Sequence, residues 1–404
     1  MTENLSSSSM PEPADSAELR WVRTWGASPQ SPESSVASLE PFADATLRQI
    51  VRISGGGRGV RLRISNEYGA APLTIGAARI GIADSDSGIL SGSDRVLTFG
   101  GRETVTVPAG APVLSDAVDL SVPALSRLTI RLYLPDHVEA CTCHGTFHAL
   151  GWMLPGDATA LTSLPADAAP LPAQALISAV EVLPDAPAAS IVVIGDSRVD
   201  GIGSTPGADR RWTDVLAERL AERGGPARYV VNQGIGGNRM LADGIGASAL
   251  ARFDRDVLAT PGLSHVVIAV GNDLVFSFAP ESEETAGFLA MFPGAPVTAD
   301  DVIAAHLQLV ARARTRGTKV YAATIAPYGG SEMYSPDGDQ AREHVNSWIR
   351  TSRAFDGVLD FDAIWRDPAD PTSIRHDLHM GDHLHGNDAG YKALAESVEL
   401  ALFD

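Results

Sequence analysis

The sequence predicts two folded parts: an all-β sandwich, followed by an α/β domain whose parallel sheet carries helices on both faces. Short runs rich in β-branched residues, separated by glycine and proline, recur through residues 21–182 without a helical stretch. After residue 190, apolar strands alternate with amphipathic helical stretches, an order typical of a parallel sheet. Residues 164–190 are rich in Pro, Ala and Asp, a composition that indicates a domain connection.

The N-terminal part, assigned to residues 19–183, shows the period of half-buried strands. Polar residues separate apolar ones in residues 60–64 and 128–132. Strands at this spacing, with Gly and Pro turns between them, favour an antiparallel sandwich or jelly roll. The expected strands are residues 47–53, 60–65, 73–82, 95–99, 104–107, 128–134 and 176–182. Because the connecting segment around residues 171–182 is apolar, we expect the sandwich to dock on the second domain.

The C-terminal part, assigned to residues 184–404, begins with the apolar strand 191–194, which Gly195 ends. Ser197 therefore lies in the loop between this strand and a helix that starts near Arg211. In open α/β sheets, ligands bind at this carboxyl edge of the strands. Further strands are expected at residues 229–232, 266–270, 320–325 and 358–361, and further helices at residues 299–316, 339–353 and 387–403.

The composition limits the partners and the location of the protein. Fifty acidic residues against 31 basic ones give a net charge of −19, which disfavours nucleic acid and anionic membranes. No run of eighteen apolar residues is present, so no membrane span is expected. Residues 1–18 lack the apolar stretch of a signal peptide, and we expect a disordered tail on a cytoplasmic protein. No feature of the sequence indicates an oligomeric state.

Four short segments place reactive residue types at the ends of strands or just before the last helix: residues 195–197, 232–238, 270–273 and 382–385. Ser197 is a candidate nucleophile, His385 a base for its proton, and Asp382 the carboxylate that fixes the imidazole tautomer. A tetrahedral intermediate also needs donors aimed at its oxyanion. The candidates are the N–H of Ser197, the glycine-rich loop at Gly237 and the side-chain amide of Asn272.

In their order, these segments resemble the four sequence blocks of the SGNH, or GDSL-type, ester hydrolases: Gly-Asp-Ser, Asn-x-Gly-x-x-Gly, Gly-x-Asn-Asp and Asp-x-x-His-Pro. The resemblance covers residues 191–400 and implies a flavodoxin-like sheet, the SGNH hydrolase fold. It implies Ser197 as nucleophile, with Asp382 and His385 completing the triad. It also implies Gly237 and Asn272 as oxyanion donors, and requires neither a cofactor nor a metal.

The β-rich part resembles, more loosely, the sandwich that precedes this domain in a two-domain bacterial branch of the same family. The chain departs from the family pattern at three positions: Arg198 replaces Leu or Ile after the serine, Val270 replaces Gly in the third block, and Gly386 replaces Pro after the histidine. Arg198 could meet an anionic group of the substrate, but pairing with Asp200 or a surface carboxylate is favoured. Together with His383, it is a candidate substrate-binding residue.

The sequence thus predicts a carboxylic ester hydrolase that forms an acyl-enzyme with short, acetyl-type esters of small molecules or sugars. One alternative is a metal-dependent hydrolase, since residues 376–385 hold four histidines and two aspartates. A smaller metal candidate combines the two cysteines, Cys141 and Cys143, with His144 and His148, at a spacing that matches no common zinc pattern. A second alternative function is carbohydrate binding by the sandwich, with an inert second domain.

Overall fold

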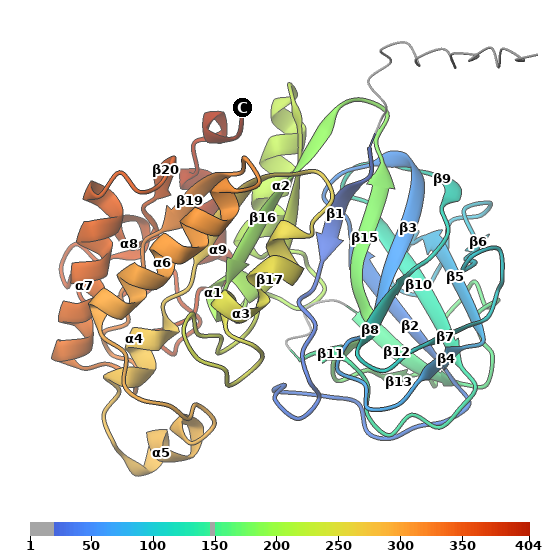
Figure 1. Ribbon diagram of the computed structural model, residues 1–404, viewed down its shortest axis with the longest axis horizontal. Coiled ribbons are helices and arrows are strands. Elements are labelled where there is room, and N and C mark those ends of the chain that lie inside the picture. The colour runs from blue at the N-terminus through green and yellow to red at the C-terminus, as the bar shows by residue number, and fades with distance from the viewer. Residues whose placement is uncertain (1–19, 146–149) are drawn as a thin grey trace, which may run out of the picture.

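The computed structural model describes residues 20–145 and 150–404, so the tail expected at residues 1–18 lies outside the described residues. Two parts lie side by side: a β-rich part drawn from blue to green and an α/β part drawn from yellow-green to red (Figure 1). The last long antiparallel strand is β15 (Ile177–Leu183), and the parallel sheet begins with β16 (Ala188–Gly195). In the described ranges, no helix combines the length and the apolar character needed to cross a bilayer.

Two antiparallel sheets form the β-rich part, which confirms the predicted sandwich. The first has the order β1-β15-β3-β8, with β9 also paired to β3, and the second has the order β13-β12-β2-β10-β5-β6. The strands of the first sheet are β1 (Val22–Gly26), β3 (Gly57–Asn66), β8 (Ala111–Leu114), β9 (Val118–Val122) and β15. Those of the second are β2 (Ala45–Arg52), β5 (Ala77–Ile82), β6 (Arg95–Val96), β10 (Arg127–Leu134), β12 (Leu150–Pro155) and β13 (Ala169–Pro170).

Two short ladders complete this part: β4 (Leu73–Ile75) pairs with β7 (Val105–Val107), and β11 (Cys143–His144) pairs with β14 (Gln174–Ala175). The single strand expected at residues 73–82 is in fact two strands that belong to different sheets. The chain divides at Gly76, where a Cβ atom would lie 2.9 Å from the ring of Tyr133. A glycine inside an apparent strand often marks such a close approach.

In the sheet of the α/β part, all neighbouring strands are parallel, and their order is β17-β16-β18-β19-β20. This is the doubly wound order 2-1-3-4-5 of flavodoxin-like folds, as predicted. The strands besides β16 are β17 (Ala227–Gly234), β18 (Leu263–Ala269), β19 (Lys319–Ala323) and β20 (Gly357–Leu359). Gly195 lies opposite Gly234 on one side and Ala269 on the other, so these three strands end at one level.

Helices cover both faces of this sheet, because β16 points alternate apolar residues to opposite sides. Ile191 and Val193 pack in the core under α2 (Trp212–Arg223), α8 (Phe361–Trp365) and α9 (Asp388–Ser397). Val192 and Ile194 pack in the core under α3 (Ala249–Phe253) and α6 (Ala299–Arg314). A π-helical turn (Asp254–Leu258) follows α3, and α7 (Pro336–Thr351) packs beside α6. The last helix expected at residues 387–403 ends at Ser397 and is followed by a 3-10 turn (Leu400–Phe403).

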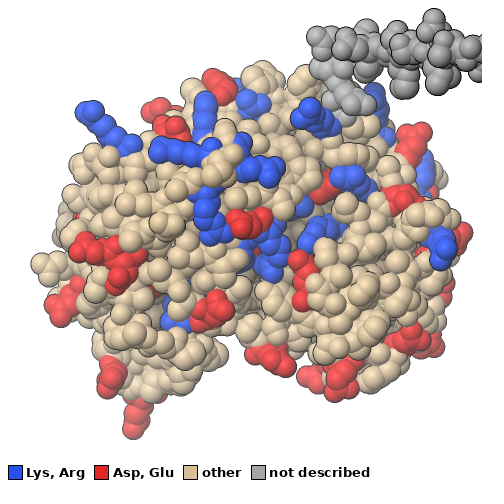
Figure 2. Space-filling view, viewed as in Figure 1, with Lys and Arg blue, Asp and Glu red and all other residues tan. Residues whose placement is uncertain are grey.

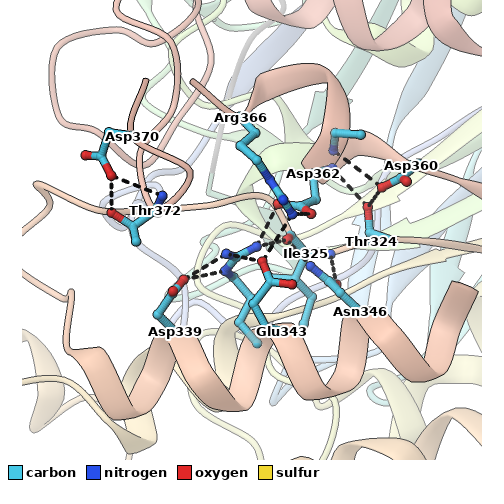
Figure 3. A network of polar contacts seen from close by, with 12 residues as sticks. Thr324, Ile325, Asp339, Glu343, Asn346, Asp360, Asp362, Arg366, Asp370 and Thr372 are labelled. Atoms are coloured by element: carbon cyan, nitrogen blue, oxygen red, sulfur yellow. Dashed lines mark hydrogen bonds and ion pairs between the residues drawn. The ribbon is translucent and has the colours of Figure 1, made fainter. Parts of the chain in front are cut away.

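A buried cluster of charged side chains fixes the loop that follows β19 (Figure 3). Asp362 on α8 is fully buried and pairs with Arg342 of α7 at 2.7 Å and with Arg350 of α7 at 2.5 Å. Asn346 of α7 accepts the N–H of Ile325 at 2.7 Å and donates to its carbonyl oxygen at 2.8 Å. Because a buried charge is costly unless it is paired, this cluster ties α7 and α8 to the carboxyl end of β19.

The sandwich is docked on the edge strand β17, as the apolar connection led us to expect. A Cβ atom on Gly26 of β1 would lie only 2.8 Å from the side chain of Val231, so the two strands are in close contact. At the far end of the junction, the hydroxyl of Tyr229 donates to the carbonyl oxygen of Gly56 at 2.8 Å. Since the sandwich covers this edge, the parallel sheet leaves no free strand there to pair with another chain.

Charged residues also cross the junction. Arg127 of the sandwich pairs with Asp209 at 2.7 Å, and Arg52 pairs with Glu218 of α2 at 2.9 Å. On the face drawn in Figure 2, lysine and arginine gather across the middle of the molecule, whereas aspartate and glutamate are more frequent along its lower rim. The partly buried pairs at the junction add to the apolar contact between the two parts.

Candidate active site

Ser197 is the first residue of α1 (Ser197–Asp200), a helix of one turn that begins directly after β16. The carboxylate of Asp196 caps this helix by accepting the N–H of Arg198 at 3.1 Å. It also accepts the N–H of Gly271, after β18, at 3.0 Å and so joins two strand ends. Ser197 was expected in a loop and instead begins a helix, because a one-turn helix is too short to show a helical period in the sequence. The loop follows at residues 201–211 and leads to α2, the helix expected near Arg211.

A continuous chain of hydrogen-bonding atoms joins Ser197, His385 and Asp382. The hydroxyl oxygen of Ser197 lies 2.9 Å from Nε2 of His385, although the two residues are 188 positions apart in the sequence. Nδ1 of the same ring lies 2.6 Å from Oδ2 of Asp382. This is the geometry in which an imidazole can accept a hydroxyl proton while a carboxylate holds its other nitrogen in the protonated form.

Asp382 is held as a carboxylate by its own loop. Its second oxygen, Oδ1, accepts the N–H of Leu384 at 3.0 Å and the N–H of His385 at 2.9 Å. Burial raises the pKa of Asp382, but the hydrogen bonds from the side chain and backbone of His385 and from Leu384 outweigh that effect and hold it well below its ordinary value. The carboxylate is therefore charged across the physiological pH range and can stabilise an imidazolium.

Three donors converge on the cleft beside Ser197. Gly237 follows β17 with a φ of +73°, a conformation that favours glycine, and Asn272 begins the short helix α4 (Asn272–Ser277). Both residues line the same cleft as Ser197. Among the described residues, the N–H groups of Ser197 and Gly237 and the amide of Asn272 have no hydrogen-bond acceptor. They are thus free to donate to an oxygen bound in the cleft.

The loop that carries Gly237 is held by a carboxylate to which the sequence assigned no role. Asp273 accepts the N–H of Met240 at 2.6 Å and the N–H of Leu241 at 3.0 Å. Burial raises the pKa of Asp273, partly offset by these backbone donors and by the charge of Arg239. The adjacent residues Asn272 and Asp273 therefore have different structural roles. The side chain of Asn272 faces the cleft, and that of Asp273 fixes the neighbouring loop.

The cleft has a volume of about 470 Å³ and is lined by polar residues of the candidate site and by several apolar side chains. That size suits a small ligand, with a few polar groups to orient it. Phe276 of α4 and Phe288 of α5 (Glu283–Leu289) contact each other edge to face, with ring centroids 5.5 Å apart. The apolar side chains that line the cleft are those of Val36, Ile202, Ile245, Phe276, Phe288, Met333 and Leu384. Val36 comes from the sandwich, so the rim of the cleft includes both parts of the chain.

The two candidate substrate-binding residues lie in different places. Arg198 is not among the residues that line the cleft, and its Nε atom donates to the carbonyl oxygen of Leu384 at 3.1 Å. It forms no ion pair with a carboxylate in the described residues, so the favoured pairing with Asp200 or a surface carboxylate is not found. Arg198 instead links α1 to the loop of His385. His383 does line the cleft, with a φ of +58°.

The histidine-rich segment 376–385 is arranged as a row of rings. The rings of His376 and His379 are 5.7 Å apart, and those of His379 and His383 are 4.4 Å apart. In the described ranges, no three His, Cys, Asp or Glu side chains are grouped as they would be around a metal ion. Cys141 and Cys143 are both buried free thiols, and His148 lies outside the described residues. Among the described residues, the segment 376–385 therefore offers no ligand set for a metal ion, and the candidate that includes His148 stays a prediction.

The comparisons with known proteins concern the C-terminal part. Residues 193–393 match the model of the GDSL-like lipase/acylhydrolase family. Similar solved structures include a lipolytic protein of the G-D-S-L family from Desulfitobacterium hafniense, with 24% identity over 52% of this chain and 96% of that chain, at a TM-score of 0.36. An acetyl xylan esterase from Geobacillus stearothermophilus shares 19% sequence identity over 52% of this chain and 94% of that chain, at a TM-score of 0.38. An aryl esterase from M. smegmatis shares 18% sequence identity over 52% of this chain and 96% of that chain, at a TM-score of 0.39. None of the curated proteins matches the chain.

Proposed function

We propose how this chain cleaves esters, on the premise that its C-terminal domain belongs to the GDSL-like lipase/acylhydrolase family and is a serine esterase. In the first step, the hydroxyl oxygen of Ser197 attacks the ester carbonyl carbon as His385 takes its proton. The single observation that carries this proposal is the hydrogen-bonding chain from Ser197 through His385 to Asp382, with spacings of 2.9 and 2.6 Å. Asp382 keeps the imidazole in the correct tautomer and stabilises the imidazolium that forms.

The attack places a negative charge on the former carbonyl oxygen. The N–H groups of Ser197 and Gly237 and the amide of Asn272 donate to this oxyanion. The intermediate then collapses as His385 returns its proton to the departing alcohol oxygen, which leaves an acyl group on Ser197. Water attacks this acyl-enzyme, His385 takes the proton of the water, and collapse releases the acid and restores the serine hydroxyl.

The preferred substrates are short-chain esters, such as acetyl esters, of small molecules or sugars. The size of the cleft, about 470 Å³, supports a small substrate over a long acyl chain. The aromatic wall formed by Phe276 and Phe288 supports an apolar group on one side of the scissile bond. We therefore rank small acyl esters with an aryl or alkyl alcohol before esters of sugars, whose hydroxyl groups need polar partners.

The proposal is tested with p-nitrophenyl acetate and with a phosphonate that labels reactive serines. We expect one label per chain, on Ser197, and activity that disappears both on labelling and in Ser197→Ala. A series of acyl chains from acetyl to octanoyl and a set of acetylated sugars then define the preference. Activity that survives in Ser197→Ala, or that chelator abolishes and Zn²⁺ or Mn²⁺ restores, would overturn the serine mechanism.

A further inference from the structure

A chain of buried hydrogen bonds runs from the sandwich into the loop that carries Gly237. His144 lies on β11 of the sandwich, and only 7% of its surface is exposed. Its Nε2 atom lies 3.0 Å from Oδ1 of Asp200, the last residue of α1. The other oxygen of that carboxylate accepts the N–H of Gly236 at 2.8 Å. Two hydrogen bonds therefore connect a sandwich side chain with the residue that precedes Gly237.

The two partners of the His144 ring determine its charge. Nδ1 lies 3.0 Å from the carbonyl oxygen of Ser28, which can only accept a hydrogen bond. Nε2 faces a carboxylate, which is also an acceptor, so both ring nitrogens carry protons and His144 is an imidazolium. Burial lowers the pKa of His144, but the charge and hydrogen bond of Asp200 outweigh burial and the opposing charge of Arg211, and the pKa is raised. The link between the two parts is thus a buried ion pair.

Asp200 is well placed to set the geometry of the oxyanion loop, because it lies on the same one-turn helix as Ser197. The helix is so close to the end of β17 that a Cβ atom on Gly234 would lie 2.2 Å from the backbone nitrogen of Asp200. With the N–H of Gly236 held on the buried carboxylate, the next N–H, that of Gly237, is left to face the cleft. The position of Gly237 therefore depends on Asp200.

Ser28 extends the same connection to the ends of two strands. Its hydroxyl donates to Oε1 of Gln233 at 2.7 Å and accepts from Nη1 of the buried Arg252 at 2.7 Å. Arg252 donates in turn to the carbonyl oxygens of Gln233 at 2.7 Å and Gly195 at 3.0 Å. The sandwich thus reaches both the strand end before Ser197 and the strand end before the oxyanion loop.

We infer that the sandwich completes the oxyanion site, with His144 as a positioning residue that acts through Asp200 and Gly236 on the N–H of Gly237. The inference rests on the proposed function, because it requires that Gly237 donates to the oxyanion. A misplaced donor weakens binding of the charged intermediate far more than binding of the ester, whose carbonyl oxygen carries little charge. Loss of the hydrogen bonds that join His144, Asp200 and Gly236 therefore lowers kcat and leaves KM almost unchanged.

Two substitutions separate the hydrogen bonds of this pair from its charge. His144→Phe keeps a ring of similar size and removes both donors. Asp200→Asn keeps an oxygen for the N–H of Gly236 and can donate its amide hydrogen to a neutral His144, so the hydrogen bonds remain. We expect kcat per active site to fall roughly 10- to 100-fold in His144→Phe, since a donor displaced by about 1 Å costs up to that much. In Asp200→Asn, the loss should stay below about fivefold, because the geometry is retained.

The chain offers a matched control at the same junction. Tyr229→Phe removes one hydrogen bond between the two parts, from β17 to Gly56, at the end of the strand far from Gly237. This variant should lower the melting temperature by a few degrees, as loss of one buried hydrogen bond does, and leave kcat unchanged. If His144→Phe does not fold, His144→Gln replaces it. Its single amide group can donate to only one of the two acceptors, so an intermediate loss of kcat is expected.

The experiment measures kcat and KM with p-nitrophenyl acetate, counts competent sites by phosphonate titration, and measures inhibition by a boronic acid that forms a tetrahedral adduct. The affinity for the boronic acid should fall in parallel with kcat/KM in His144→Phe. The inference is overturned if kcat per titrated site is unchanged in that variant, or in His144→Gln, or if Tyr229→Phe lowers kcat equally. Those results leave the proposed function standing, whereas a wild-type enzyme that the phosphonate does not label at Ser197 overturns both.

Discussion

The two sides of Ser197 are held in place in different ways. On one side, the loop of His385 is fixed by its own atoms, with Asp382 accepting two backbone N–H groups from the next three residues. On the other side, the loop of Gly237 is fixed by carboxylates from distant segments. Asp200 holds the N–H of Gly236, and Asp273 holds the N–H groups of residues 240 and 241. The histidine side is local in sequence, and the oxyanion side is assembled by tertiary contacts.

This difference indicates which properties a substitution will change. On the histidine side, a change of one group alters the chemistry and leaves the surrounding structure intact, because the turn is short and partly exposed. On the oxyanion side, a change that breaks the hydrogen bonds of a buried carboxylate alters position, stability and rate together. The substitutions below test this distinction, starting with the largest expected effect.

Asp382→Asn tests the histidine side. The amide can still accept the N–H groups of the turn, but it favours the wrong tautomer of His385, so kcat should fall about 10⁴-fold. The melting temperature should stay within about 2 °C of the wild type, since the backbone contacts of the turn are retained. Both are measured on one preparation by steady-state kinetics and a thermal melt. Nearly full activity would mean that another carboxylate, such as Asp377, orients the imidazole.

Asn272→Ala tests the donor that the oxyanion side contributes from a side chain. Removal of one such donor typically lowers kcat by about 10²–10³-fold, equivalent to about 2.7–4 kcal/mol. KM should change little, because the donor acts on the charged intermediate. The melting temperature should also change little, since no acceptor for this amide exists within the described ranges. A destabilised protein with nearly normal kcat would remove Asn272 from the site and assign it to the turn.

Asp273→Asn, at the adjacent position, should behave differently. Its carboxylate accepts two backbone N–H groups, and an amide there places an NH₂ group against one of them. An unsatisfied buried donor costs about 1–3 kcal/mol, so the melting temperature should fall by several degrees. We expect kcat to fall by about tenfold as the oxyanion loop shifts. A loss of kcat with an unchanged melting curve would show that Asp273 acts on the reaction directly and not through the loop.

The sequence predicted the histidine side and the strand ends because their signals are local. The spacing of Asp382 and His385 is three residues, and each strand that precedes a reactive segment is an apolar run. Ser197 could likewise be assigned from the strand that ends before it. The alternation in residues 60–64 and 128–132 indicated β3 and β10 for the same reason.

The remaining parts depend on contacts that no local pattern encodes. Arg198 was expected to pair with a carboxylate, and it instead donates to the backbone of Leu384, 186 positions away in the sequence. The sequence of an Asn-Asp pair does not indicate the role of its aspartate. Only the fold shows that Asp273 faces the neighbouring loop. His144 was considered as a metal ligand beside two cysteines, because sequence proximity groups it with them. The fold turns its ring toward Asp200 instead.

His306 does not line the cleft and tests whether a buried polar group outside the site affects stability alone. The residue lies on α6, is 1% exposed, and its ring contacts those of Trp348 and Phe355. Neither ring nitrogen has a hydrogen-bond partner among the described residues. Burial lowers the pKa of His306 to about 4, from an ordinary value of 6.5. His306 is therefore neutral in the folded protein at pH 5, where an unfolded chain would bind a proton.

The sign of the resulting pH dependence follows from proton linkage. Above about pH 6.5, His306 is neutral in both states, and its stabilising contribution is fully present. As the pH falls toward about 4, only the unfolded chain gains the proton, so the free energy of unfolding decreases by up to about 3 kcal/mol.

His306→Leu should remove the contribution of His306 to this pH dependence and leave kcat at pH 8 unchanged. His344→Leu, at an exposed position of α7, is the control and should keep the wild-type slope. Urea titrations at pH 7.5 and 4.5 measure the difference. Equal slopes in wild type and His306→Leu would mean that His306 gains a partner in acid, and an altered kcat would mean that α6 is coupled to the cleft.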